Sequence, residues 1–476
     1  MNKLHCIVLT LVLTCFGVLS AQNTKEKMIQ EIDANASSYW NVAKDIWTFA
    51  ELGYQEERSS ALLQKTLKDA GFDLKVGVAD IPTAFIAEYG SGEPVIALLA
   101  EFDALPGLSQ DSIPVRAKIM GKASGHACGH HLFGTASVAA AITLKNWMAS
   151  SQSQGTLRLY GTPAEEGGAG KVYMVRDGLF DDVDAVLHWH PGDRNSASPS
   201  NSLANKSGKF RFYGKSAHAA AAPHRGRSAL DGVEAMNYMV NLMREHVPQE
   251  TRMHYVITKG GDAPNIVPEF AEVYYYIRHP QAAQSGAIFD RVVEAAKGAA
   301  MGTGTRMEFE VIHGLYNLLP NKTLAKVVYE NLNLVGGYTF SAEEEAFAHK
   351  IRESLGDNLP DLTFTNEVQP FVERPAGGST DVGDVSWVVP TAGMSSATWV
   401  PGTPAHSWQA VASGGMSIGM KGMLVAAKTL AASGLDLFQN PQVIKTAEKE
   451  RREKAGDDFI YKALLGDRKP PLDYRN

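Results

Sequence analysis

Apolar runs alternate with longer amphipathic stretches over the first 190 residues of the chain. Short apolar runs, which predict buried strands, lie at 94–100, 155–160 and 183–187. Stretches with the apolar spacing of helices lie at 26–50, 58–70, 132–148 and 170–177. Because strands and helices alternate, the pattern favours an α/β domain with a mostly parallel sheet.

Acidic and histidine side chains follow the three expected strands. In chain order they are Glu101 and Asp103, then Glu165 and Glu166, then His188 and His190. The carboxyl ends of parallel strands meet at one edge of a sheet, where ligands bind in such folds. We therefore expect these carboxylates and imidazoles to lie close together.

The N-terminus has the pattern of a secretory signal peptide. Lys3 precedes an apolar run over 7–19, and the side chains at 18–20 suit cleavage, so residues 1–20 are expected to be removed on export. The run is shorter than the roughly 20 apolar residues of a membrane span, and an uncleaved anchor is the alternative. We expect a secreted, periplasmic protein with no membrane span in the mature chain, because no second long apolar segment follows.

Cys128 is the one cysteine left after the two in the leader are removed. Exported proteins normally pair their structural cysteines, which a lone cysteine cannot do within the chain. His126, His130 and His131 surround it, as expected for a thiolate that binds a metal ion. His126 and His131 are alternatively loop residues or supports for the ligands.

The adjacent carboxylates Glu165 and Glu166 suit two different tasks. Neighbouring side chains in an extended chain point apart, so one can bind a metal ion with Cys128 and His130 while the other serves as general base. His188 and His190 share a strand face, so either could reach the same ion. A turn-rich loop at 402–408 adds His406.

Size and charge narrow the classes of protein. The 476 residues exceed the usual length of one domain, roughly 250 to 300 residues, so two domains or an insertion are expected. The net charge of -7 is spread along the chain without a basic block, which argues against a nucleic-acid partner. The charged stretch 445–454 reads as a solvated helix.

Five segments together resemble the M20 family of metallopeptidases and amidohydrolases, and the resemblance runs from about residue 30 to 430. In order they are His126-Ala-Cys128-Gly-His130, Pro163-Ala-Glu165-Glu166-Gly-Gly, Gly214-Lys-Ser-Ala-His218-Ala-Ala, Pro223-His224-Arg-Gly-Arg-Ser-Ala-Leu and Gly402-Thr-Pro-Ala-His406. Within the family the chain is most similar to the amidohydrolases that carry a cysteine at the metal site.

The resemblance implies a role for each matching residue. The expected ligands of two divalent cations, Zn²⁺ or Mn²⁺ with Co²⁺ as a further candidate, are Cys128, His130, Glu166, His406 and one histidine of 188–190. A Trp-His-Pro pattern found in one group of the family selects His190, whereas other cysteine-containing members place the histidine three residues before the proline, which keeps His188 as the alternative. Glu165 matches the general base, and Asp103 is expected to support a ligand.

The resemblance also implies an α/β catalytic domain interrupted by a smaller α/β lid through which two subunits pair. The expected parts are the signal peptide 1–20, the catalytic domain 21–205 and 314–440, the lid 206–313 and a C-terminal tail 441–476. Lid positions associated with substrate are His218, Asn265 and Arg278, and the guanidinium of Arg278 suits a carboxylate. A homodimer is expected, with a hetero-oligomer as the alternative.

The expected activity is metal-assisted hydrolysis of the amide bond in N-acyl or N-aroyl amino acids, aminobenzoyl-glutamate among them. One alternative is a dipeptidase with the same chemistry. Another is a metal-bearing binding protein without catalysis, although such a protein would not need the base Glu165.

Overall fold

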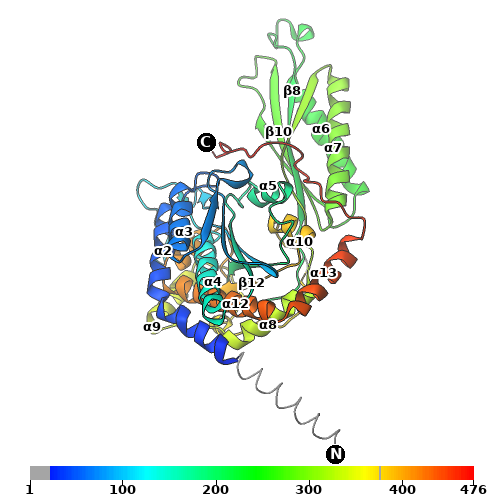
Figure 1. Ribbon diagram of the computed structural model, residues 1–476. Helices are drawn as coiled ribbons and strands as arrows, with labels where there is room; N and C mark the ends of the chain where they lie inside the picture. Colours follow the sequence, from blue (N-terminus) through cyan, green and yellow to red (C-terminus); the bar gives the residue numbers. More distant parts are fainter. Residues whose placement is uncertain (1–21, 375–376, 476) are drawn as a thin grey trace, which may run out of the picture.

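The computed structural model describes residues 22–374 and 377–475, and the expected signal peptide at 1–20 lies outside them. Figure 1 shows a larger domain built around a central sheet, a smaller domain that projects from it, and a C-terminal segment that crosses between the two. The chain enters the smaller domain and later returns to the larger one, so the smaller domain is an insertion.

The larger domain contains a six-stranded mixed sheet. In spatial order its strands are β1 (Asp73–Val76), β2 (Phe85–Ser91), β6 (Gly155–Gly161), β3 (Val95–Ala100), β7 (Ala185–Gly192) and β12 (Thr391–Ala397). The last four strands are parallel, while β1 and β2 form an antiparallel edge. Every residue of β3 is buried, as expected for a central strand covered on both faces. The predicted α/β fold with a mostly parallel sheet is confirmed.

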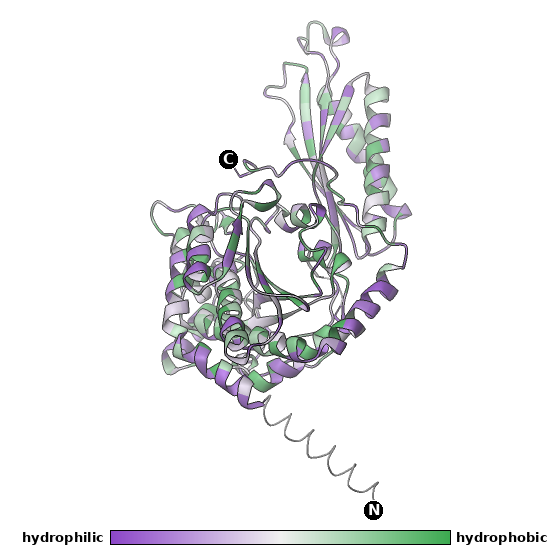
Figure 2. Ribbon diagram, in the orientation of Figure 1, coloured by the Kyte–Doolittle hydropathy of each residue, from purple (hydrophilic) through white to green (hydrophobic). Residues whose placement is uncertain are grey.

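Helices of the larger domain pack on this sheet and on one another. They are α2 (Ala36–Phe49), α3 (Glu57–Asp69), α4 (His130–Ser151), α5 (Gly170–Arg176), α8 (Lys322–Val335), α9 (Ala342–Arg352), α10 (Val382–Val388), α11 (Trp408–Gly414), α12 (Ser417–Gln439) and α13 (Pro441–Ala455). The long helices α4 and α12 pack against each other, α4 over β3 and β7 and α12 over β7 and β12. Their side chains are mostly buried, which agrees with the apolar colouring of α12 in Figure 2.

Two elements differ from the sequence expectation. The single helix expected at 26–50 is two helices, 22–34 and α2, with Asn35 in a turn between them, a position that asparagine favours. The strand expected to end at Leu187 continues to Gly192, because β7 pairs in parallel with β12 along that stretch and matches His188 to Gly393 and His190 to Ser395. The two histidines therefore lie within the strand.

The smaller domain, here called the lid, is a four-stranded antiparallel sheet with two helices. Its elements are β8 (Ala204–Tyr213), α6 (Ala229–Met243), β9 (Arg252–Lys259), β10 (Phe270–His279), α7 (Ala282–Thr303) and β11 (Arg306–Leu315), and the strand order is β11-β8-β10-β9. Every second residue of β10 is buried, so one face of the sheet packs on α6 and α7. Strand β9 lies at the free edge.

The chain after α13 forms a strap, defined here as residues 456–475. It leaves the charged and hydrophilic helix α13 and runs past the base of the lid towards the larger domain (Figure 1, Figure 2). Tyr461 donates a hydrogen bond to Asp384 Oδ1 over 2.7 Å, and Arg468 forms an ion pair with Glu310 of β11 over 3.2 Å. The strap therefore contacts both domains.

None of the individual helices in the described parts of the chain has both the length and the hydropathy of a membrane span, and α11 and α12 reach them only when taken together, with a bend of 73° between them.

Candidate metal centre

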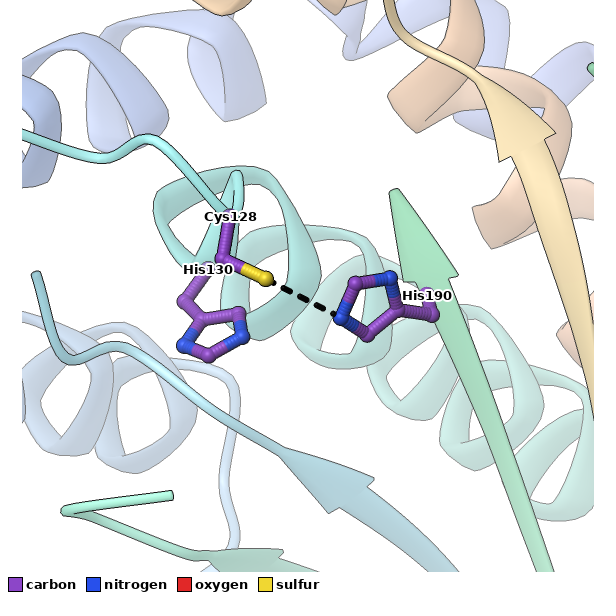
Figure 3. Close-up of side chains that lie close together, drawn as sticks. All are labelled: Cys128, His130 and His190. Atoms are coloured by element: carbon purple, nitrogen blue, oxygen red, sulfur yellow. Dashed lines mark hydrogen bonds between the residues drawn. The ribbon is translucent and has the colours of Figure 1, made fainter. Parts of the chain in front are cut away.

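Cys128, His130 and His190 come together at the carboxyl edge of the sheet (Figure 3). Cys128 lies just before α4 and is buried, and its Sγ is 3.4 Å from Nε2 of His190 near the end of β7. His130 is the first residue of α4, and its ring is nearly perpendicular to that of His190 with centroids 5.8 Å apart. One ion could therefore contact a sulfur and two imidazole nitrogens here.

Gly129 allows the side chains of its neighbours, Cys128 and His130, to point towards the same site. Its φ of +77° is a left-handed conformation that glycine adopts readily, and a Cβ at this position would come within 2.7 Å of Pro191. The close approach of the Cys128–His130 turn to the end of β7 thus depends on the missing side chain.

A second group of donors lies next to the first. Glu166 Oε1 is 3.1 Å from Nε2 of His406, and both residues lie near Cys128, so the sulfur belongs to both groups. The backbone N–H of His406 donates to the carbonyl of Ala127 over 3.0 Å, which anchors its loop beside the cysteine. Two adjacent donor groups that share a ligand suit a pair of cations.

Glu165 belongs to a third group, with Glu101 and His130. Glu165 and Glu166 lie in a turn and not in the extended chain that the sequence suggested, yet their side chains still reach different partners. Burial, reinforced by the neighbouring Glu101 and Glu166, raises the pKa of Glu165 well above its usual value. A carboxylate with a raised pKa suits a general base that must also return its proton.

Asp103 supports the site from the loop after β3. Its Oδ1 accepts a hydrogen bond from Nδ1 of His130 over 2.8 Å, and its Oδ2 accepts one from the backbone N–H of Glu166 over 2.9 Å. One buried carboxylate therefore fixes the orientation of the His130 ring and the position of the Glu166 turn. This contact is the support expected for a metal-binding histidine.

Lys171 and Asp381 extend the network beneath the site, and the sequence motifs assigned neither of them a role. Nζ of Lys171, on α5, lies 2.7 Å from a carboxylate oxygen of Glu101 and 2.7 Å from one of Asp381. Burial opposes the charge of Lys171, but the carboxylates of Asp381 and Glu101 outweigh it and raise the lysine pKa. A lysine five residues after a Glu-Glu pair, in a glycine-rich segment, was the only sequence signal.

Three buried atoms in the site lack a hydrogen bond. They are Glu101 Oε2, His130 Nε2 and Glu166 Oε1. Glu101 Oε2 and His130 Nε2 lie 3.2 Å apart, and Glu166 Oε1 lies 3.1 Å from His406 Nε2. Each of these converging atoms is a good ligand for a divalent cation. Burial, with Glu166 adding to it, raises the pKa of the Cys128 thiol, and a bound cation is the ordinary means of stabilising a thiolate in such a place. The donor set therefore fits the two cations expected from the sequence.

His188 lies outside these groups. It packs over Gly393 of β12, where an added Cβ would come within 2.4 Å of the imidazole, and it lines a different pocket with Ser196 and Met394. Although His188 and His190 share a strand face, two residues advance the chain by about 6.6 Å. Of the two histidines of β7, His190 is the one that approaches Cys128.

His126 and His131 make structural contacts. His126 Nε2 lies 3.0 Å from the carbonyl oxygen of Ile46 in α2, and His131 Nε2 lies 3.0 Å from that of Gly414 in α11. The two rings pack against each other with centroids 4.9 Å apart. These contacts join α4 to its neighbours and leave both residues out of the donor groups.

The donor groups open into a cleft of about 760 Å³ between the larger domain and the lid. Arg278 and Tyr276 of β10 line it from the lid side, so the structure brings Arg278 to the same cavity as Glu165 and His406. His218 and Asn265 do not line it. They lie together on exposed lid loops, where Ala219 N donates to Asn265 O over 3.0 Å.

Comparison with known proteins agrees with this geometry. Residues 204–303 match the peptidase dimerisation domain of the M20 type. The chain is 41% identical over 449 residues to a subunit of the p-aminobenzoyl-glutamate hydrolase of Escherichia coli, an alignment that covers 89% of this chain and 93% of that one. It is 30% identical over 451 residues to the mouse Xaa-Arg dipeptidase, covering 92% and 94%.

A solved structure described as a dinuclear metal-binding peptidase of the M20 family, from Bacillus subtilis, has the same fold. The TM-score is 0.56 at 18% identity, over 86% of this chain and 99% of the other. The chain thus belongs to the M20 family of metallopeptidases and amidohydrolases. The predictions of the family, of the fold and of a hydrolase acting on amide bonds are confirmed, and the match to a dimerisation domain supports assembly into oligomers.

Proposed function

We propose that the protein hydrolyses the amide bond of N-aroyl and N-acyl amino acids, with p-aminobenzoyl-glutamate as the leading substrate. The single observation that carries this proposal is the shared cleft, in which the candidate metal ligands, Glu165 and the guanidinium of Arg278 meet. Hydrolysis of an amide that carries a carboxylate requires activation of the amide, a general base and a cationic group for the carboxylate. The similarity to the p-aminobenzoyl-glutamate hydrolase of Escherichia coli supports the choice of substrate.

The proposed ligands are Cys128, His130, Glu166, His190 and His406. Two divalent cations held there would polarise the scissile carbonyl and make a water molecule more acidic. Glu165, which lines the cleft beside the donor groups, accepts the proton from the attacking water and then delivers it to the leaving amine. Arg278 binds a substrate carboxylate and thereby fixes the amide relative to Glu165.

Zinc is the proposed metal at the sulfur-containing positions, with manganese as the alternative and cobalt as a further candidate. Thiolate and imidazole ligands favour zinc, whereas carboxylates also suit manganese. Metal analysis of His190→Ala and His188→Ala protein tests the ligand set: we expect the first variant to lose bound metal and the second to keep it. The reverse result would make His188 the ligand.

The lid is proposed to pair with a second copy. Its edge strand β9 exposes Tyr255, Val256 and Ile257, and α6 exposes Tyr238 and Leu242. Such an apolar edge invites pairing with another chain. His218 and Asn265 lie outside their own cleft, and we propose that they bind substrate in the cleft of the partner. Because the Escherichia coli relative is named as one subunit of its enzyme, a hetero-oligomer is the alternative.

Sedimentation of wild-type protein and a Val256→Glu variant tests this assembly, with a dimer expected for the first and a monomer for the second.

Export to the periplasm through the leader at 1–20 is likewise proposed, and N-terminal sequencing of protein from a periplasmic extract checks it.

A substrate panel tests the activity. Purified protein loaded with Zn²⁺, Mn²⁺ or Co²⁺ is assayed with p-aminobenzoyl-glutamate, acetylated amino acids and dipeptides that end in arginine. We expect the highest kcat/KM for the first compound, with release of p-aminobenzoate. A preference for the dipeptides would establish the alternative of a dipeptidase, and no hydrolysis with any of the metals would reject the proposal.

A further inference from the structure

The strap ends against the loop that carries Glu165 and Glu166. Tyr474 Oη donates a hydrogen bond to the carbonyl of Glu166 over 3.0 Å, and Arg475 donates to the same oxygen through Nη2. The Tyr474 ring packs edge-on against Tyr54 with centroids 5.6 Å apart, and Tyr54 in turn donates to the carbonyl of Gly168 over 2.7 Å. Two aromatic residues thus fix the end of the strap beside the site.

The strap is also held before it reaches the site. Besides its ion pair with Glu310, Arg468 donates to the carbonyl of Ile312 in β11. Arg176 of α5 donates to the carbonyl of Arg468 over 2.7 Å. Contacts to both domains therefore set the path of the strap, so Arg475 reaches the cleft from a defined direction.

Arg475 lines the same cleft as Glu165, His406 and Arg278. Its Nε is buried and has no hydrogen-bond partner, although Nη2 is bound to Glu166. Arg278 likewise has a buried Nε without a partner. Neither guanidinium forms an ion pair with any residue in the described parts of the chain. Both side chains are partly exposed, and each has a buried Nε without a partner, so both are available for anionic groups of a ligand.

Arg278 and Arg475 are the only arginine or lysine residues among the described residues that line the cleft. Every N-acyl amino acid has an α-carboxylate, and an acidic amino acid has a second carboxylate on its side chain. Two separate guanidinium groups, one from the lid and one from the strap, match that pair. We assign the carboxylate common to all such substrates to Arg278, as in the proposed function, which leaves Arg475 for the second carboxylate.

We propose that Arg475 binds the side-chain carboxylate of the substrate and so makes the enzyme selective for N-acylated acidic amino acids. This proposal rests on the proposed amidohydrolase function and adds a residue that determines specificity. The contact with Glu166 orients the guanidinium, and its partnerless Nε donates to the carboxylate. The strap then forms one wall of the substrate site.

Kinetics with two substrates of equal shape test the role of Arg475. p-Aminobenzoyl-glutamate and p-aminobenzoyl-glutamine differ only in the charge of the side-chain group. In wild-type protein we expect a higher kcat/KM for the glutamate compound. Arg475→Gln should lower that value about 10- to 100-fold, the loss of one charge-assisted contact, while changing the glutamine compound by less than about 3-fold. Arg475→Lys should recover part of the preference, because it restores the charge without the fork.

Arg468→Gln is the matched control. It removes an arginine of the strap that does not line the cleft, so loosening of the strap should change both substrates by the same factor. An equal loss for both substrates in Arg475→Gln would show a purely structural role and overturn the proposal. Equal use of both substrates by the wild-type protein would overturn it as well.

Equilibrium binding separates this proposal from the proposed function. Calorimetry on metal-loaded Glu165→Gln protein should show tighter binding of the glutamate compound, and the added Arg475→Gln change should abolish the difference. Selective binding by a wild-type protein that hydrolyses neither compound would reject the amidohydrolase function and support the role of Arg475. Absence of selective binding would reject that role even if the enzyme is active.

Discussion

The candidate residues at the cleft and those on the outer loops of the lid differ in their burial and in the contacts that they make. Beneath the cleft, His130 is buried and hydrogen-bonded to Asp103, and Glu101 pairs with the buried Lys171. On the lid loops, His218 is exposed, and its Nδ1 accepts hydrogen bonds from the backbone N–H groups of Ala220 and Ala221. The cleft is therefore organised within one chain, whereas the contacts of His218 are confined to its own exposed loop.

Removal of the base should have the largest effect on the cleft. Glu165→Gln keeps the size of the side chain but cannot accept the proton, so we expect kcat to fall by about 10³- to 10⁴-fold. Metal content should stay near that of the wild-type protein, because Cys128, His130, His190, Glu166 and His406 remain. Steady-state kinetics and metal analysis on the same preparation check this. A loss of metal together with activity would instead place Glu165 among the ligands.

Removal of the buried lysine tests how the cleft is held together. Lys171→Met leaves Glu101 and Asp381 without their cation, and breaking a buried pair in this way costs about 3 to 5 kcal/mol of folding stability. The measurement is the urea midpoint of unfolding. Lys65→Met is the control, because Lys65 pairs with Asp69 on the exposed surface of α3 and should change stability by less than about 1 kcal/mol. Equal small effects would show that the network is not needed for stability.

The lid loops are tested by subunit mixing. His218→Ala should lower kcat/KM about 100-fold, a loss typical of one donor to the reacting carbonyl. Glu165→Gln subunits mixed with His218→Ala subunits would form hybrid dimers with one intact site. Such a mixture should recover about a quarter of wild-type activity if each lid serves its partner. No recovery in a mixture shown to exchange subunits would mean that His218 serves its own chain or has no role.

The sequence predicted the cleft better than the lid loops, for a physical reason. The convergence of Glu101, Glu165 and Glu166 follows from their position after the buried strands β3 and β6, which short apolar runs reveal. Cys128 and His130, at the start of α4, were found from their motif and not from a strand. His218 and Asn265 lie on exposed loops outside the cleft, and their roles stay predictions.

Contacts between distant segments were beyond sequence reasoning. The end of β7 depends on pairing with β12, about 200 residues further along the chain. Arg475 carries no local signal, because its place in the cleft results from the path of the whole strap past β11 and α5. Both features come from tertiary contacts and not from local spacing.

The smallest expected effect is on stability, at the junction of the larger domain, the lid and the strap. Asp384 of α10 accepts hydrogen bonds from Tyr461 Oη and from the backbone N–H of Tyr316, just after β11. Burial, with Asp381 nearby, raises the pKa of Asp384 to about 7. Between roughly pH 4, the pKa of an unfolded aspartate, and pH 7, the folded protein keeps a proton that the unfolded chain has lost.

Stability should therefore fall as pH rises through this window, because the native state binds more protons than the unfolded state. Asp384→Asn removes this dependence, since the amide stays neutral at every pH. Relative to wild type, the variant should gain about 2 kcal/mol, or a few degrees in Tm, between pH 5 and pH 8. Thermal unfolding of both proteins at the two pH values checks this. If the Tm of both proteins changed equally between the two pH values, Asp384 would be ionised in the folded protein at both. Its protonation would then contribute nothing to the pH dependence of stability.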